Sequence, residues 1–182
     1  MCRWQSYAAR TLALYVDWSG EVGQEVAACD EALLAQFTHE KPWGIDLAID
    51  LCSCHPALLS DPAYLRIFVV NLWEKFHLPY EGEPQLVQWN SLEGMEHVQE
   101  YALTYLTPRA HLVAHLPRYH EEAYLNFVTR EFVCPIQVAV LCQQWFLARQ
   151  VRLSVIFRER GPRTKPVSLS FAEKNMRTDV SG

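Results

Sequence analysis

The sequence lacks the features that mark several large classes of protein. It has only 7 glycines and 10 prolines among 182 residues, so it is neither collagen-like nor a low-complexity linker. It contains no run of 18 apolar residues, and no membrane span is therefore expected. Acidic residues outnumber basic ones by 21 to 16, and the net charge of −5 argues against a protein that binds nucleic acid by neutralising phosphates.

Several catalytic signatures are missing as well. The sequence has no glycine-rich phosphate or dinucleotide loop and no G-x-S-x-G turn. Its first residues also lack the long apolar segment of a signal peptide, since Leu12–Val16 is short and Asp17 follows at once. We therefore expect a cytoplasmic protein whose six cysteines are reduced.

The composition is that of a folded protein, with 50% apolar and 20% charged residues. We divide the chain into three parts. Residues 1–40 form an N-terminal extension with one amphipathic helix, predicted over Glu21–Phe37, and Leu12–Val16 before it is either a short strand or the start of a helix. Residues 41–158 form the main domain, and residues 159–182 form a flexible polar tail.

The main domain has alternating strand patterns interrupted by two helical patterns. A strand is predicted over Ile45–Cys52, and a helix begins at Ser60-Asp61-Pro62 and runs to about Phe76. A second helix opens at Cys134-Pro135. The remaining predicted strands are Gln85–Trp89, Tyr101–Leu106, Ala110–Leu116, Ala123–Val128 and Val151–Phe157. Strands in runs with few helices predict an α+β fold, a mostly antiparallel sheet with helices on one face.

Cys52, Cys54 and His55 form the stretch most similar to a metal site. As a second ligand pair we consider His111 and His115, which have H-x₃-H spacing. On a strand, residues four apart lie about 13 Å apart, too far to share one ion. We therefore expect no metal, and we expect Cys52 to be buried and His55 to be exposed at the end of the strand.

Two stretches resemble the short bacterial and archaeal S-adenosylmethionine (AdoMet) decarboxylases. The first, Trp43–Asp61, resembles that family's opening glycine, strand, Cys-x-Pro-like turn and Leu-Leu pair, and Tyr80-Glu81-Gly82-Glu83-Pro84 continues it. The second comprises Ala114-His115-Leu116 and Glu122–Phe127. Gln144-Trp145-Phe146 lies near the family's closing segment. The resemblance spans about residues 41–150 and implies the family's fold.

The resemblance also implies a chemistry, from which this sequence departs. Family members cleave their own chain at a serine, and the resulting pyruvoyl group forms a Schiff base with the substrate amine. That serine corresponds to Ala110, which has no hydroxyl, and the residue before it is Arg109. An upstream processing serine corresponds to Ala102, and the proton-donating cysteine corresponds to Arg130. Among these positions only His115 is retained as the catalytic candidate.

We therefore expect a catalytically degenerate relative that forms no pyruvoyl cofactor and acts by binding. The expected partners are a second copy, an active paralogue or an AdoMet-like nucleoside, in the context of polyamine and spermidine biosynthesis, with no nucleic acid or membrane. The alternative is an AdoMet-using enzyme with lyase-type elimination, in which His115 or Glu131 is the base. Acidic candidates for a cationic ligand and aromatic candidates for stacking are Asp50, Glu83, Glu121, Glu122, Glu131, Trp43, Trp89 and Tyr124.

Overall fold

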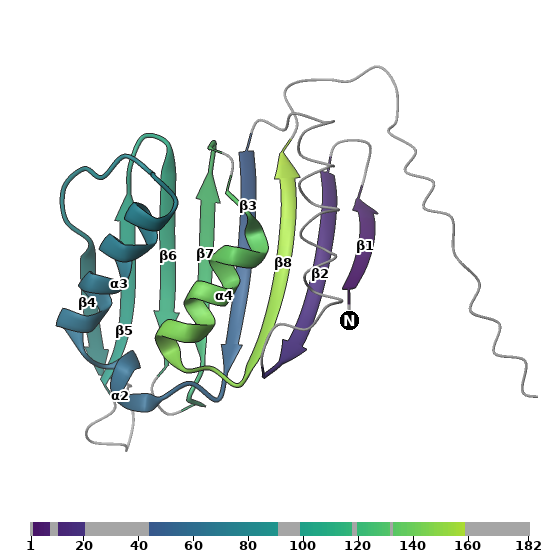
Figure 1. Cartoon of the computed structure of the whole chain (residues 1–182). Helices are drawn as coiled ribbons and strands as arrows, with labels where there is room; N and C mark the ends of the chain where they lie inside the picture. Colours follow the sequence, from purple (N-terminus) through teal and green to yellow (C-terminus); the bar gives the residue numbers. More distant parts are fainter. Residues whose placement is uncertain are drawn as a thin grey trace, which may run out of the picture.

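The computed structural model joins the strand patterns into one sheet of eight strands (Figure 1). It describes residues 2–7, 11–20, 44–90, 99–117, 120–131 and 133–158. The strands are β1 (Cys2–Tyr7), β2 (Thr11–Ser19), β3 (Gly44–Cys52), β4 (Gln85–Asn90), β5 (Gln99–Leu106), β6 (Ala110–Leu116), β7 (Ala123–Thr129) and β8 (Gln150–Arg158). Their order is β1-β2-β8-β3-β7-β6-β5-β4, and every pairing between these neighbours is antiparallel.

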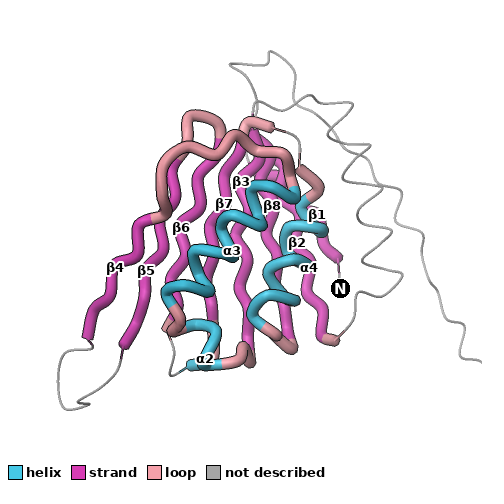
Figure 2. The backbone as a smooth tube through the Cα atoms, turned by 60° about the vertical axis from the view of Figure 1, so that its left-hand side comes forward, coloured by secondary structure: helices cyan, strands magenta, loops and turns pink. Residues whose placement is uncertain are grey.

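Two long helices cover one face of this sheet, as Figures 1 and 2 show. They are α3 (Pro62–Lys75) and α4 (Pro135–Phe146), and the short α2 (Pro56–Leu59) precedes α3. In β3 the residues Ile45, Leu47, Ile49 and Leu51 are fully buried, and the residues between them are not. This two-residue period places one side of each strand against the helices, so the predicted α+β fold is confirmed.

The two long helices begin where the sequence predicts. The Asp61 side chain accepts hydrogen bonds from the backbone N–H groups of Ala63 and Tyr64, at 2.9 and 3.2 Å, and Pro62 occupies the first turn. An aspartate cap followed by proline satisfies the free N–H groups of a helix start. Cys134 caps α4 before Pro135. No helix in the described ranges is both long and apolar enough to cross a membrane.

Part of the predicted N-terminal extension belongs to the sheet. Strand β2 includes Leu12–Val16, which settles the choice between strand and helix, and it pairs with β8 along its whole length. Strand β1 was not predicted. The expected helix Glu21–Phe37 and the tail 159–182 lie outside the described residues. The division of the chain at residue 40 stays a prediction.

A buried polar network fastens the end of β2 to α4. The Trp18 indole N–H donates to Gln143 Oε1 at 2.9 Å, and Gln143 Nε2 donates to the carbonyl of Gly20 at 2.8 Å. Gly20 N–H donates in turn to the carbonyl of Arg149 at 3.0 Å. These bonds satisfy buried polar groups that would otherwise cost free energy.

Candidate functional site

The face of the sheet opposite α3 and α4, here called the open face, carries several of the predicted site residues. Cross-strand pairing places Ala102, His115, Tyr124, Asp50 and Arg152 side by side in one row. Asp17 on β2 extends the row beyond Arg152. The row thus joins residues that lie more than 130 positions apart in the sequence, and it brings three of the predicted candidates, His115, Tyr124 and Asp50, together.

His115 has an aromatic and an acidic neighbour within this row. Its ring stacks on that of Tyr124, with centroids 6.4 Å apart and planes 24° apart. Its Nε2 lies 3.6 Å from a carboxylate oxygen of Glu100. The Tyr124 hydroxyl donates a hydrogen bond to Glu122, and this bond, aided by burial, raises the pKa of Tyr124 to about 12. Tyr124 is therefore a proton donor, not a phenolate, at neutral pH.

Asp50 is a half-buried carboxyl in the middle of the row. Burial raises its pKa, Arg152 opposes the rise, and Glu122 adds to it. The local charge is therefore mixed, since acidic groups surround one guanidinium. Such a surface provides both acceptors and a cation, so it does not by itself select one kind of ligand.

The second group of predicted residues lies at the β5–β6 turn, residues 107–110. Thr107 Oγ1 donates to the carbonyl of Ala110 at 2.9 Å and accepts from its N–H at 3.1 Å. The carbonyl of Arg109 accepts from the N–H of Arg130 at 2.9 Å. The Arg109 guanidinium binds the Glu131 carboxylate across the turn. The Arg109–Ala110 peptide therefore sits in a hydrogen-bonded hairpin turn that is tied to the end of β7.

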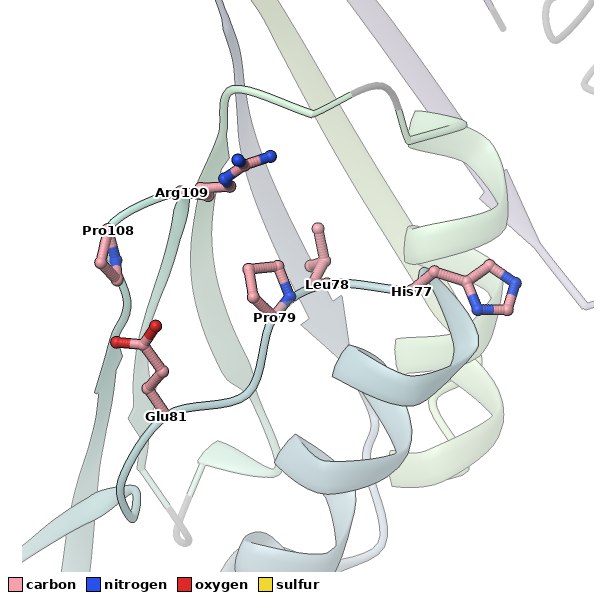
Figure 3. Close-up of a pocket in the computed structure, with 6 residues that line it drawn as sticks. All are labelled: His77, Leu78, Pro79, Glu81, Pro108 and Arg109. Atoms are coloured by element: carbon pink, nitrogen blue, oxygen red, sulfur yellow. The ribbon is translucent and has the colours of Figure 1, made fainter.

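Two cavities flank this turn, and Pro108 and Arg109 line both. The helix-side cavity, of about 410 Å³, lies between the turn and the segment that follows α3 (Figure 3). His77, Leu78, Pro79 and Glu81 complete its lining. The turn pocket, of about 190 Å³, is lined by Gly44, by residues 107–111 and by residues 128–130. The Glu81 carboxylate points toward the turn in Figure 3.

The structure separates the predicted residues into these two groups. Ala110 and Arg130 line the turn pocket, and Glu131 contacts it through Arg109. His115 lies five residues along β6, roughly 17 Å away at about 3.3 Å per residue. Ala102 pairs with His115, not with Ala110.

Four further candidates lie elsewhere. Trp43 falls outside the described residues. Glu83 is exposed in the loop before β4, and Trp89 lies on β4 at the edge of the sheet, where its backbone pairs with Glu100. Glu121 ends the turn before β7, where its carbonyl accepts from the N–H of Cys54 at 2.7 Å.

The Cys52–His55 stretch forms the predicted end of a strand, with one correction. His55 is exposed, as expected, but Cys54 is the buried cysteine and Cys52 is only half-buried. The reason is that Cys52 lies on the open face, whereas the chain turns at Ser53, with φ 55°, and directs Cys54 inward. Burial raises the pKa of Cys54 to about 12. Within the described residues no three His, Cys, Asp or Glu side chains are grouped to hold a metal ion.

Comparison with known proteins finds a similar fold but no similar sequence. No protein-family model and no curated protein matches the chain. Its fold is similar to the crystal structure of the adenosylmethionine decarboxylase from Aquifex aeolicus VF5, with a TM-score of 0.56. The match covers 68% of this chain and 97% of that one at 12% sequence identity. The chain therefore has an AdoMet decarboxylase-like α+β fold.

Sequence reasoning missed three contributors to these sites. Arg152 lies beside Asp50, Asp17 lies on the far side of Arg152, and Glu100 lies beside His115. Each occupies a polar position of an alternating strand, which indicates an exposed face but not the neighbouring strand. Only the strand order, with β8 between β2 and β3, brings Arg152 and Asp17 into the row of Asp50.

Proposed function

We propose that this protein is a catalytically degenerate relative of AdoMet decarboxylases that acts by binding and forms no pyruvoyl group. Its ligand or partner would belong to AdoMet and polyamine metabolism. The observation that carries the proposal is the alanine at position 110, where the resemblance requires a serine. The Ala110 side chain is a buried methyl group, 3% exposed, and it offers no oxygen that could attack the Arg109 carbonyl.

The surroundings of this peptide support the same reading. The Arg109 carbonyl and the Ala110 amide are both engaged in the turn's hydrogen bonds. Thr107 is the nearest hydroxyl, but it precedes the peptide by two residues, and an acyl shift needs the hydroxyl on the residue that follows the attacked carbonyl. Arg130 stands where the family has its proton-donating cysteine. Its positive charge would repel a sulfonium substrate, which is also positively charged.

Partner binding would use the open face of the sheet. Four large apolar side chains are exposed there, namely Val87, Leu106, Val113 and Tyr124. Leu106, Val113 and Tyr124 occupy diagonally adjacent positions on β5, β6 and β7 and form one patch. Val87 on β4 lies farther away, in the row of Ala102 and His115. Contiguous apolar surface of this kind is typical of protein contacts. A second copy of the chain or an active paralogue would cover it.

A second candidate function is an AdoMet lyase that needs no pyruvoyl group. The observation in its favour is the arrangement around His115, whose ring stacks on Tyr124 and whose Nε2 lies near Glu100. A carboxylate beside an imidazole orients it as a base, and an aromatic ring attracts a cationic ligand.

Mass spectrometry of the intact protein tests the central claim. We expect one species near 21.1 kDa. Two fragments, one with a blocked ketoacyl N-terminus, would overturn the proposal. Calorimetric titration with AdoMet then separates the candidates, because the lyase needs saturable binding followed by product, whereas a pure protein partner predicts no heat.

Restoring the serine provides the matched variant. Ala110→Ser supplies the hydroxyl but leaves Ala102 and Arg130, and groups that act as a unit are not recovered one at a time. We expect no release of labelled CO₂ from carboxyl-labelled AdoMet by this variant. The triple variant Ala102→Ser, Ala110→Ser, Arg130→Cys is the comparison. Turnover by the single variant would show that Arg130 does not occupy the donor position.

A further inference from the structure

The turn pocket is basic in a protein that is acidic overall. Arg109, His111 and Arg130 line it, and none of the described residues in its lining is Asp or Glu. The whole chain carries a net charge of −5. A local concentration of cations against that background attracts anions, because the field near a concave surface is dominated by the charges that line it.

The two arginines come from different segments of the chain, and a hydrogen bond joins their backbones. Arg109 lies in the β5–β6 turn and Arg130 follows β7, and the backbone bond from the N–H of Arg130 to the carbonyl of Arg109 joins them at 2.9 Å. The Thr107–Ala110 bonds fix the turn itself. A site whose backbone is already ordered loses little entropy when a ligand binds.

The Arg109 guanidinium already forms an ion pair with one carboxylate, that of Glu131. Glu131 Oε1 lies 2.5 Å from Arg109 Nη1, and the side chains are 40% and 63% exposed, respectively. This contact shows that the guanidinium is placed to receive an oxyanion from the side of β7. Because the pair is exposed, it is weak and exchangeable, so a ligand oxyanion can share or displace Glu131.

The volume of the pocket limits the size of the ligand. About 190 Å³ is many times the roughly 10–15 Å³ that a single water requires. It therefore accommodates a phosphate or a short carboxylic acid. The helix-side cavity across Pro108 is less suited to an anion, because Glu81 points toward the turn there (Figure 3).

We infer that the turn pocket is a binding site for a small oxyanion, a phosphate or carboxylate group held by Arg109 and Arg130. This inference names a ligand class opposite in charge to the sulfonium that the resemblance implies. It does not require the protein to be a degenerate decarboxylase, and it fails or holds independently of that proposal.

Calorimetric titration at constant ionic strength tests the site, with inorganic phosphate in one arm and succinate in the other. We expect saturable binding of at least one probe with one site per chain. Arg130→Gln and Arg109→Gln should each weaken it about tenfold or more, as expected for the loss of a charge-assisted bond. Arg66→Gln, which removes an exposed cation from α3, is the matched control and should leave the affinity within about twofold.

A substitution that should strengthen ligand binding gives an independent check. Glu131→Gln removes the competing carboxylate and should tighten binding several-fold, whereas Glu74→Gln on α3 removes the same charge at a distance and should not. The inference is overturned if neither probe binds saturably, if Arg66→Gln weakens binding as much as Arg130→Gln, or if Glu131→Gln has no greater effect than Glu74→Gln. An intact-mass result does not bear on any of these outcomes.

Discussion

The two faces of the sheet are built from the same strands but have opposite characters. On the helix-covered face, Leu112 and Leu125 are 0% and 3% exposed. One position along in the same strands, Val113 and Tyr124 are 43% and 41% exposed. The difference shows that one set of residues packs in the core, while the other is available for contacts outside the fold.

The open face also holds several ionisable groups. Asp50, Glu122 and His115 lie there beside exposed apolar side chains, whereas the helix-covered face is almost entirely apolar. The described exceptions on the buried side, Thr129 and Gln143, have hydrogen-bond partners. The helix-covered face thus forms the hydrophobic core, and the candidate site residues lie on the open face and at the turn.

The largest expected loss of stability comes from a buried residue of β6, and its exposed neighbour provides the comparison. Leu112→Ala removes a fully buried side chain and should lower the free energy of unfolding by about 2–5 kcal/mol. Val113→Ala, on the open face, should cost less than about 1 kcal/mol in the isolated chain. Urea denaturation of both variants measures the difference. Equal losses would mean that the open face is buried, for example by a second copy.

A smaller loss is expected from the network that joins β2 to α4. Trp18→Phe keeps most of the ring but leaves Gln143 Oε1 without its donor, and an unsatisfied buried acceptor costs about 1–3 kcal/mol. Gln150→Ala is the control, because it breaks an exposed 3.3 Å contact with Asp17. If the control costs as much as Trp18→Phe, the burial of this network is not what stabilises it.

The ion pair at the turn should matter little for stability. Arg109→Gln breaks an exposed pair, and such pairs contribute between about 0 and 1 kcal/mol. Thermal unfolding at low and high salt provides the measurement. A loss above about 2 kcal/mol would mean that Arg109 holds the turn together, in which case its binding role must be tested with Arg130→Gln alone.

The smallest effect concerns Asp50 and depends on pH. Burial raises its pKa in the folded state, so the folded chain holds this proton more tightly than the unfolded chain. Stability is therefore lost as pH rises from 3.8, the ordinary value, through the raised pKa. Asp50→Asn should be slightly more stable than the parent at pH 7, and the gain should shrink toward pH 4. A variant that is less stable at pH 7 would contradict this assignment.

The strands and helices of the main domain follow from the sequence because their patterns are local. The alternation in β3, the Asp61-Pro62 cap and the strand patterns from β4 to β7 all depend on neighbours within a few residues. The place of β1 and β2 in the sheet could not be predicted this way. A strand is stabilised by pairing with its neighbours, and one neighbour of β2 is β8, at the far end of the described chain. A local sequence pattern does not reveal such a distant partner.

The candidate site shows the same limit. His115 and Ala102 were singled out as positions in a pattern, but their adjacency depends on the register of β5 against β6. The turn pocket needs three segments, Gly44, residues 107–111 and residues 128–130, which only the folded sheet brings together. Residue types therefore identified candidates, and the pairing of strands determined which of them share a site.

The position of β8 has a consequence for how the chain folds as it is synthesised. Thr11 pairs with Arg158, so the N-terminal hairpin of β1 and β2 finds its place only after the strand that lies between it and β3 has been made. Before β8 is made, β1 and β2 can pair only with each other in the described sheet. The edge of β3 that later pairs with β8 is also unpaired. Such long sequence separations slow folding and expose strand edges to other chains. The nascent protein therefore exposes these edges until β8, the last described strand, closes the gap.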